Sequence, residues 1–389
     1  MSLALTATLV MLVQQAFATF TRGLVPVLAP AMAPDLGVSP SLAGLYAAVA
    51  AAAALVATLG VGGLLARYGA LRVSQVALAI AAFGLALAAP SGVALVALGA
   101  IPVGLGSTVS TPASSHLLAR VVPPRQQPLL FSIKQTGVPV GVAMSGLLGP
   151  GFAAAFGWRG ALVVSALICL ALCLALEPLR DRFDADRDPR ARIGLSGTLE
   201  TLATVRRLAA IRILALAFAV LVGLQFVFQT FLVVFLVEGL GWTLAAAGAL
   251  FSAATLAAIP ARILWGAAGA RCSARLLLAV IATGTCLSFA VLALLDRESS
   301  KGAVLAAALA ASATVMSWHG LMLAELARLS PPGRAGAVTG AVLAFAQVGQ
   351  IALPPVFGAL VGAGLGWGAA WIALGLPAAA IALWLVRLR

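Results

Sequence analysis

The sequence predicts an all-α integral membrane protein with twelve transmembrane helices in two pseudo-symmetric six-helix bundles. Three observations support this fold class: the composition is strongly apolar, apolar stretches of membrane-spanning length recur along the chain, and the second half of the chain repeats the first. Hydrophobic residues make up 62% of the 389 residues and charged residues only 9%. A chain of this composition has too few polar residues to cover the surface of a soluble protein.

Twelve apolar stretches are each long enough to cross about 30 Å of hydrocarbon as a helix. Most connections between them are short, as expected for antiparallel neighbours. The third, sixth, ninth and twelfth stretches carry no embedded charge, which predicts that these helices face lipid. The predicted helices cover residues 5–33, 41–66, 72–89, 92–119, 128–156, 160–176, 213–237, 243–269, 274–295, 302–327, 335–362 and 367–386.

The internal repeat consists of residues that recur at a nearly constant shift. It predicts an N-terminal bundle at 1–178, a cytoplasmic linker at 179–211 and a C-terminal bundle at 212–389. Two parallel bundles are typical of secondary transporters, which bind their solute near the middle of the membrane where the bundles meet. Gly37, Gly44, Gly62 and Arg67 recur 204 positions later as Gly241, Gly248, Gly266 and Arg271.

Basic residues predict the orientation in the membrane. With the N-terminus inside, eighteen Arg residues fall in inner loops and the tail, whereas only Arg159, Arg297 and Lys301 fall in outer loops. This bias places both termini in the cytoplasm. It also accounts for the net charge of +13 without a soluble basic domain for nucleic acid. The Arg-rich, Asn-free composition suggests a GC-rich bacterial gene and therefore a bacterial inner membrane.

The linker at 179–211 mixes Asp and Arg residues and contains Pro189 and Gly194. We expect a solvated cytoplasmic segment, with a short amphipathic helix near 196–210 on anionic lipid. Recognition of the substrate by this segment is the alternative.

The loops after the second and eighth helices share a sequence pattern. They read Gly62-Gly63-Leu64-Leu65-Ala66-Arg67-Tyr68-Gly69 and Gly266-Ala267-Ala268-Gly269-Ala270-Arg271. Both resemble the loop motif G-x-x-x-D-R-x-G of the major facilitator superfamily. The resemblance implies two bundles that rock around a central site, with Gly62, Arg67, Gly69, Gly266 and Arg271 as gating residues.

One position departs from that motif, because its Asp is Ala66 in the first copy and Ala270 in the second. The resemblance implies that this acid helps to latch the outward-facing state. A latch here must be weaker or be made by other residues.

Ionisable residues inside the membrane are costly unless they face partners or water, so each is a candidate for function. A charge present in only one half of the repeat is tied more closely to the solute than to the scaffold. Arg22, Lys134, Arg262 and His319 meet this criterion.

Arg22 lies near the middle of the first helix, with Gln15 and Thr19 close to the same face. Its guanidinium fork suits a carboxylate or oxyanion, so Arg22 is the main predicted anion ligand. The alternative is a structural Arg that caps carbonyls or pairs with a distant acid.

Lys134 and Arg262 are further candidates for binding. Lys134 lies about two turns inside the fifth helix, from which it could also extend to the cytoplasm. Arg262 resembles the eighth-helix Arg that binds carboxylate in monocarboxylate and oxalate carriers of the superfamily. Bracing of the nearby motif loop is the alternative for Arg262.

The acids limit how protons could be coupled to transport. Of eleven, only Glu325 lies inside a span, whereas Asp35 lies at an outer helix end. Excess positive charge attracts anions, and proton coupling then requires His319, Glu325 or Asp35. A structural His beside Trp318 is the alternative for His319.

Uncharged side chains complete the predicted substrate site. Gln225 and Gln229 share one face of the seventh helix, and Gln347 lies on the eleventh. Hydrogen bonding between helices is the alternative for all three. Gln15 and Trp318 are included with them as substrate-binding residues.

Signals for other classes of function are absent from the sequence. There is no phosphate-binding glycine loop, no metal-binding His or Cys motif and no credible catalytic triad, so we expect no enzyme, metal or cofactor. The sequence therefore predicts a monomeric, proton-linked carrier of a small organic carboxylate or inorganic oxyanion. The alternative function is a proton-driven exporter of drugs or hydrophobic metabolites.

Overall fold

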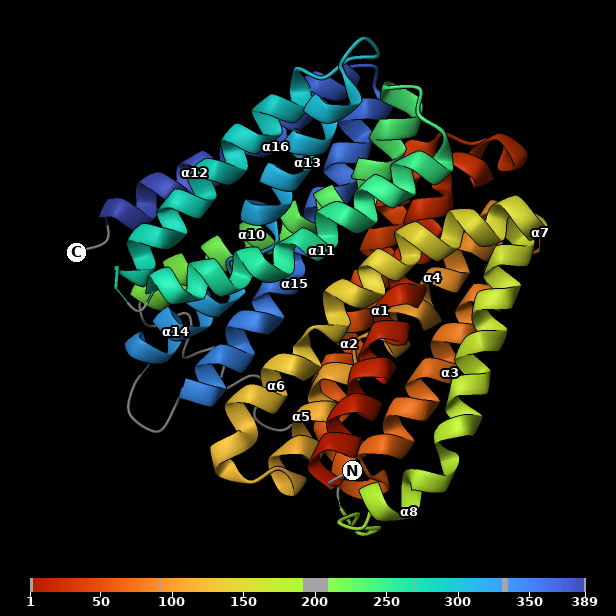
Figure 1. Ribbon diagram of the computed structural model, residues 1–389, viewed down its shortest axis with the longest axis vertical. Coiled ribbons are helices and arrows are strands. Elements are labelled where there is room, and N and C mark those ends of the chain that lie inside the picture. The colour runs from red at the N-terminus through yellow and green to blue at the C-terminus, as the bar shows by residue number, and fades with distance from the viewer. Residues whose placement is uncertain (1–2, 91, 192–208, 270, 331–334, 388–389) are drawn as a thin grey trace. The chain divides into compact units, whose positions relative to one another are not determined.

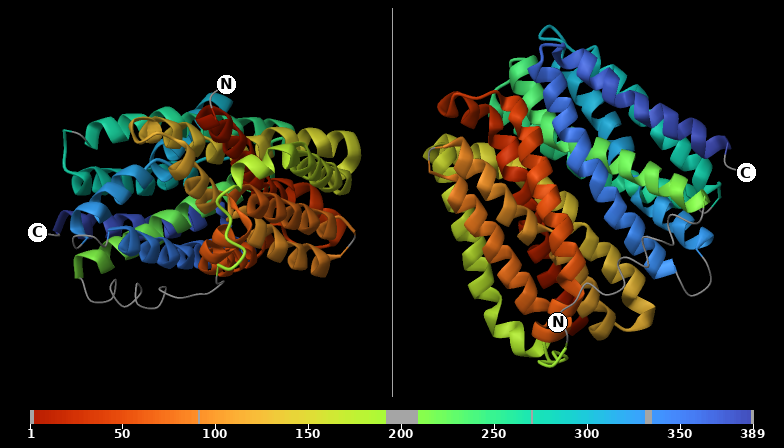
Figure 2. Two further views of the ribbon diagram at one scale, coloured as in Figure 1. Left: turned by 90° about the horizontal axis from the view of Figure 1, so that it is seen from below. Right: turned by 180° about the vertical axis from the view of Figure 1, so that it is seen from behind.

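The computed structural model describes residues 3–90, 92–191, 209–269, 271–330 and 335–387, and these are mostly helical (Figure 1). Contacts divide the chain into two compact units. Unit 1 comprises Met1–Gly37 and Val49–Leu195, and unit 2 comprises Val38–Ala48 and Ser196–Arg389. Figure 2 shows that the long helices within each unit run alongside one another.

Unit 1 contains the helices of the N-terminal half. Helix α2 begins in unit 2, because Ala43–Ala48 group with that unit, and continues into unit 1. The helices are α1 (Leu3–Leu36), α2 (Ala43–Tyr68), α3 (Ala70–Ala88), α4 (Val93–Ser107), α5 (Ser110–Val121), η2 (Pro124–Gln126), α6 (Gln127–Gln135), α7 (Gly137–Leu176), η3 (Glu177–Leu179) and α8 (Arg180–Phe183).

Unit 2 contains the C-terminal half and the short segment Val38–Ala48, which the sequence analysis places in the N-terminal bundle. Gly44 of this segment packs against the backbone of Pro354, and Gly358 packs against the backbone of Ser41. The helices are η1 (Pro40–Leu42), α10 (Ala209–Val234), the π-helix η4 (Phe235–Gly239), α11 (Leu244–Gly269), α12 (Ala274–Ala293), α13 (Lys301–Val315), α14 (His319–Leu329), α15 (Ala335–Gly362) and α16 (Gly366–Arg387).

The predicted all-α membrane fold is confirmed. Eleven spans in the described residues are long and apolar enough to cross a membrane, and one of them, Leu129–Phe183, has 55 residues. It contains the fifth and sixth predicted helices, because the chain turns at Gly157, where φ is 68°. The turn is visible as a corner in α7 (Figure 1). Only glycine adopts this φ without strain, so one residue ends the fifth helix and starts the sixth.

Three predicted helices are interrupted partway along. The fourth is divided into α4 and α5 at Thr108–Val109, the fifth into α6 and α7 at Thr136, and the tenth into α13 and α14 at Met316–Trp318. The first and third interruptions are 208 positions apart, which is also the shift at which Ala119-Arg120 recurs as Ala327-Arg328. Where a membrane helix is interrupted, some backbone N–H and C=O groups lose their partners within the helix. Such interruptions commonly lie at polar binding sites.

Glycines bring α1 and α7 into backbone contact in unit 1. A Cβ atom on Gly137 would lie 2.7 Å from the carbonyl oxygen of Leu12, and one on Gly141 would overlap the carbonyl oxygen of Ala16. Helices in lipid associate through such close packing, because no hydrophobic force drives them together. Gly137 and Gly141 therefore allow the two helices to pack backbone to backbone.

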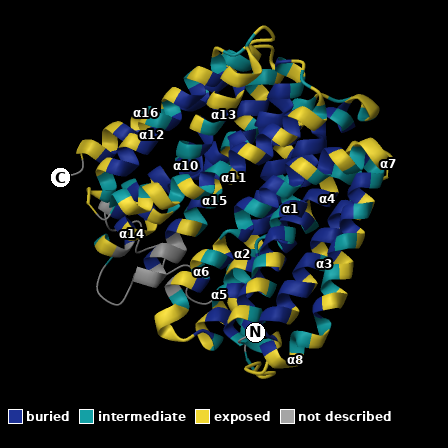
Figure 3. Ribbon diagram, viewed as in Figure 1, coloured by how far each residue is buried: buried dark blue, intermediate teal, exposed yellow. Residues whose placement is uncertain are grey.

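Several helices carry exposed apolar residues at helical spacing, and exposed residues are yellow in Figure 3. On α3, for example, Val76, Ile80 and Phe83 are exposed, and Phe83 is 61% exposed. Equivalent stripes lie on the second arm of α7, on α12 and on α16. These are the third, sixth, ninth and twelfth predicted helices, and the stripes fit the lipid-facing role predicted for them.

We expect Gly141→Ala to destabilise the protein, because the new methyl group would meet the backbone of Ala16. Overpacking of this kind costs about 1–3 kcal/mol. Unfolding by SDS in mixed micelles measures the change. Gly151→Ala on the same helix is the matched control, since an added Cβ there meets nothing within 4 Å. Equal stability of the two variants would contradict the packing role of Gly141.

Candidate functional site

Unit 1 contains a compact polar cluster around Gln15 of α1. Lys134 Nζ of α6 donates hydrogen bonds to Oε1 of Gln15 and Oε1 of Gln135, both at 3.0 Å. Thr111 Oγ1 of α5 donates to the same Gln15 oxygen at 2.9 Å. Thr19 lies one turn along α1, and its hydroxyl is 3.5 Å from Gln15 Nε2. Three helices therefore direct polar side chains to one point.

The interruption of the fifth helix explains why Lys134 is buried. The residue lies in the last turn of α6, two residues before Thr136, and is 2% exposed. Gly137 then packs against Leu12 and Gln15 of α1, which holds this end of α6 against α1. Lys134 therefore points into the bundle and does not extend to the cytoplasm.

The charge of Lys134 has no counter-ion within the described residues. Both acceptors of its hydrogen bonds are neutral amide oxygens, and it makes no ion pair there. A buried ammonium in this situation is destabilised relative to one in water, because amide oxygens replace its hydration only in part. A negatively charged ligand would remove that cost.

Arg22 lies on the face of α1 that carries Gln15, seven residues further along, and is partly buried. Seven residues correspond to about 10 Å along a helix. Thr19 lies between the two positions on this face, three residues before Arg22 and four residues after Gln15. Arg22 and Lys134 thus give unit 1 two embedded cations.

In unit 2, Arg262 lies next to the interruption of the tenth helix. Its Nε donates to the carbonyl oxygen of Met316 at 2.8 Å, and Trp265 Nε1 donates to Ala313 at 2.9 Å. Arg262 therefore braces the end of α13. Its two terminal nitrogens have no hydrogen-bond partner in the described part of the chain, so the fork remains able to take a ligand.

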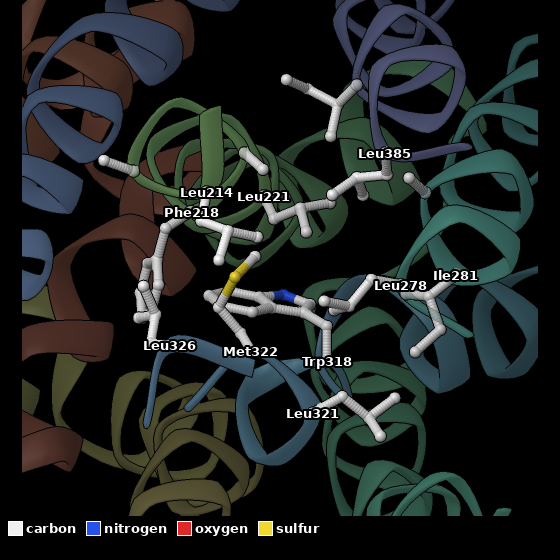
Figure 4. Close-up of a cluster of buried hydrophobic side chains, with 14 of the residues drawn as sticks. Leu214, Phe218, Leu221, Leu278, Ile281, Trp318, Leu321, Met322, Leu326 and Leu385 are labelled. Atoms are coloured by element: carbon white, nitrogen blue, oxygen red, sulfur yellow. The ribbon is translucent and has the colours of Figure 1, made fainter. Parts of the chain in front are cut away.

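Trp318 and His319 lie at the same interruption. Their rings stack with centroids 3.8 Å apart, and the Phe218 ring lies nearly perpendicular to the Trp318 ring, with centroids 4.9 Å apart. Trp318 is 0% exposed and inserts into the hydrophobic cluster of unit 2 with Met322 (Figure 4). Its Nε1 donates to Val315, so the indole is a fully satisfied core residue.

His319 and two of the glutamines each have a buried polar atom that makes no hydrogen bond with the described residues. Among the described residues, His319 Nδ1, Gln225 Oε1 and Gln347 Oε1 are buried without a hydrogen bond. Gln225 is 5% exposed, and Gln229 on the next turn is partly buried. Unsatisfied buried atoms are costly, and a ligand or water would satisfy them. These atoms are compatible with a binding role, which stays a prediction.

The three acidic or imidazole candidates for proton coupling differ in their surroundings. Glu325 is 3% exposed and accepts hydrogen bonds from Arg275 and from two nitrogens of Arg328. Asp35 accepts from Trp158 Nε1 at 2.9 Å and Arg159 Nη1 at 2.8 Å. Both carboxylates are therefore tied to guanidinium groups, whereas His319 is held by aromatic stacking.

The motif loop between α2 and α3 is held by an acid from outside the loop. Asp184 accepts hydrogen bonds from the backbone N–H groups of Leu71 and Arg72, at 2.8 and 2.9 Å, and so caps α3. A Cβ on Gly69 would overlap the Asp184 side chain, and φ of Gly69 is 90°. Burial raises the pKa of the Asp184 carboxyl, and the two N–H donors oppose this rise.

Other contacts fix the same corner of unit 1. Asp188 N donates to the Ala66 carbonyl oxygen at 2.8 Å, and Asp186 pairs with both Arg120 and His116. Phe183 is 0% exposed. The first part of the predicted solvated linker is therefore packed onto unit 1, because an apolar side chain and a helix cap anchor it. The helix predicted near 196–210 lies almost wholly outside the described residues.

The remaining gating residues show no comparable contacts. Arg67 lies over the ring of Tyr68, at 5.5 Å from its centroid. Gly62 and Gly266 lie within α2 and α11, and an added Cβ on either would meet nothing within 4 Å. Arg271 is exposed. The structure gives no steric reason for these two glycines.

Sequence reasoning missed Thr111, Gln135 and Asp184 as functional positions. Gln135 and Gln347 belong to a pattern, Gln-x-Gly, that occurs in both halves of the chain, and a residue kept in both halves favours a scaffold role. Thr111 precedes Pro112, and a proline in the first turn of a helix is a start signal that could have located α5. Asp184 has no local signal, because its partners are 112 and 113 residues away.

Comparison with known proteins agrees with the fold. The profile of the Major Facilitator Superfamily matches residues 11–342. Two uncharacterized MFS-type transporters of Mycobacterium tuberculosis, from strains CDC 1551 / Oshkosh and H37Rv, are 29% and 28% identical over 289 residues. The matched region is 73% of this chain and 63% of each relative, so the chain spans less than two thirds of their length.

Solved transporter structures share the fold at low sequence identity. A POT family transporter in complex with 5-aminolevulinic acid superposes with a TM-score of 0.78 at 14% identity, covering 98% of this chain and 95% of that one. A bacterial homologue of the human lysosomal transporter Spinster gives 0.73 at 16%, with the same coverage. A mutant of the nucleoside transporter NupG gives 0.76 at 14%, covering 98% and 99%.

We expect Asp184→Ala to lower the free energy of unfolding by about 1–2 kcal/mol, the usual cost of losing a helix cap. Amide hydrogen exchange should accelerate at Leu71 and Arg72, which lose their acceptor. Asp181→Ala is the matched control, because that side chain is 83% exposed. Unchanged exchange at both amides would contradict the capping role.

We expect Glu325→Gln to destabilise the protein by about 1–3 kcal/mol, because Arg275 and Arg328 would both lose the carboxylate that binds them. Arg328 is exposed, which keeps the loss below that of a fully buried pair. Thermal unfolding in detergent measures the change. Glu298→Gln serves as control, since Glu298 is exposed in the loop before α13. A stable Glu325→Gln protein with altered proton coupling would instead favour a coupling role.

Proposed function

This chain belongs to the Major Facilitator Superfamily, and we propose that it is a secondary transporter that moves a small anion, an organic carboxylate or a small oxyanion, by alternating access. Family membership rests on the match over residues 11–342. The substrate class rests on the chemistry of the residues inside the membrane.

The observation that carries this proposal is the buried Lys134. Its ammonium is 2% exposed and hydrogen-bonded only to neutral oxygens in the described part of the chain. Arg22 adds a second positive charge on the neighbouring face of α1. An anionic substrate is the ligand that this site favours, because it would compensate the charge of Lys134, whose partners in the described residues are neutral.

The embedded acids do not offset these cations. Glu325 is bound by Arg275 and Arg328, and Asp35 is bound by Arg159. The negative charges of Glu325 and Asp35 are therefore neutralised by these Arg residues and do not neutralise Lys134. A cationic substrate would be repelled by the ammonium of Lys134, which makes no ion pair among the described residues.

Finer features of the proposal follow from the sequence. We propose proton-linked transport, a bacterial inner membrane location with both termini in the cytoplasm, and a monomer. The positive-inside distribution of Arg supports the orientation.

Uptake into proteoliposomes tests the anion proposal. The purified protein should accumulate at least one of radiolabelled lactate, oxalate, succinate, nitrate or phosphate, and a pH gradient that is acidic outside should increase the rate. Arg22→Ala should abolish uptake while the protein stays folded, because the fork that binds the anion is lost. Arg125→Ala, which removes an exposed Arg in η2, should leave uptake unchanged.

Full anion uptake by Arg22→Ala would remove the ligand role of this residue. Absence of anion uptake, together with pH-driven movement of a hydrophobic dye such as ethidium, would replace the proposal with the exporter alternative.

A further inference from the structure

We propose that Lys134 is the group that carries the coupled proton: its amine is neutral when the site is empty and takes up a proton when the anion binds. This inference rests on the proposed anion transport. It gives Lys134 the proton-coupling role for which the sequence analysis named His319, Glu325 and Asp35 as candidates.

The hydrogen bonds of Lys134 match a neutral amine. A neutral amine has two N–H groups, and the structure provides two acceptors, Gln15 Oε1 and Gln135 Oε1, each at 3.0 Å. An ammonium has three N–H groups, and the third has no acceptor among the described residues. The protonated form is therefore complete only with an added acceptor, which an anion would supply.

Gln15 is a neutral amide, and its oxygen has no capacity left to accept a further N–H of the ammonium. Its Oε1 already accepts from both Lys134 and Thr111, and its Nε2 faces the Thr19 hydroxyl at 3.5 Å. The Gln15 amide is thus fixed as an acceptor for one N–H of Lys134. This arrangement holds the amine in place in either protonation state.

No acid faces Lys134 from the elements packed against α6 in unit 1, which are α1, α5, η2 and α7. Asp35 lies 20 residues beyond Gln15 on α1, which is about 30 Å along the helix. Asp186 is held at the end of α5 by Arg120 and His116. The other charged or titratable groups of these elements are Arg22 of α1, Arg125 of η2, and Arg159, Cys169 and Cys173 of α7, the last three beyond the turn at Gly157.

Arg22 strengthens the coupling between anion and proton. It keeps its positive charge at all physiological pH values. An anion bound next to Lys134 favours the protonated form of the amine, because an opposite charge stabilises the ammonium. Arg22 attracts the anion, and the anion in turn holds the proton on Lys134.

The alternative proton carriers are less suited to this step. Glu325 and Asp35 are each tied to guanidinium groups, which stabilise the charged carboxylate. His319 stacks on Trp318 at 3.8 Å in unit 2, next to the permanent charge of Arg262. Within the described part of the chain, Lys134 is hydrogen-bonded to neutral groups alone.

The proton and the anion bind and leave together. The amine of Lys134 takes one proton from the side of higher proton concentration, an N–H bond forms, and the anion binds to the resulting ammonium. Release of the anion on the other side returns the amine to its neutral form, and the proton leaves to water. One proton moves with each monovalent anion, so the cycle moves no net charge across the membrane.

The composition allows a direct test, because Lys134 and Lys301 are the only two lysines. In protein labelled with ¹⁵Nζ-lysine, NMR should show two side-chain signals, and Lys301→Gln assigns them. Lys301 is exposed at the start of α13. The Lys134 signal should switch from amine to ammonium as lactate, succinate or nitrate is added at constant pH, whereas the Lys301 signal should not respond.

Binding measured against pH gives a second readout. If one proton is taken up per anion, affinity for the bound probe should fall about tenfold per pH unit above the titration of Lys134. Lys134→Gln should bind more weakly, with affinity independent of pH in that range, and Lys301→Gln should behave as wild type.

The outcomes separate this inference from the proposed function. Anion binding with a Lys134 signal that is ammonium throughout would overturn the coupling role and leave anion transport intact. Failure of all three probes to bind, with no response of the Lys134 signal, would overturn both. The NMR titration uses wild-type protein, so a folding defect in Lys134→Gln does not affect it.

Discussion

The direct backbone contact between α1 and α7 is the constraint on which the polar cluster of unit 1 depends. Gly137 and Gly141 have no side chains, so the two helices approach until Gly137 meets Leu12 and Gln15, and Gly141 meets Ala16. The same approach brings the end of α6 to Gln15 and places Lys134 within 3.0 Å of its oxygen. In lipid, where apolar surfaces gain nothing by meeting, this packing both joins the helices and positions the charge.

The protein treats its embedded charges in two different ways. Glu325 and Asp35 are each paired with guanidinium groups, which makes their charge part of the scaffold. Lys134 has neutral partners among the described residues, so its charge depends on what else enters the site. A group of the second kind can respond to a ligand, because its two protonation states differ in how completely they are satisfied.

The loop between α2 and α3 shows how one contact can be supplied from a distant part of the chain. Ala66 stands where the family motif has an acid, and the described loop is held instead by Asp184, whose carboxylate caps α3, and by Asp188, which bonds to Ala66. These residues follow the sixth predicted helix. The beginning of the polar linker therefore completes the loop, which explains why Phe183 and Asp184 are buried.

The sequence by itself determined the membrane class, the all-α fold and the twofold repeat, because hydropathy over a helix length and recurring residues are local or periodic properties. It also identified Lys134 and Gln15 as polar positions inside the membrane. The tertiary structure decided which side chains meet: Thr111, Gln15 and Lys134 converge because three helices are interrupted or packed through glycine, and Asp184 reaches α3 from 112 residues away. Contacts of this kind depend on the distance between backbones, and no pattern along a single helix contains that distance.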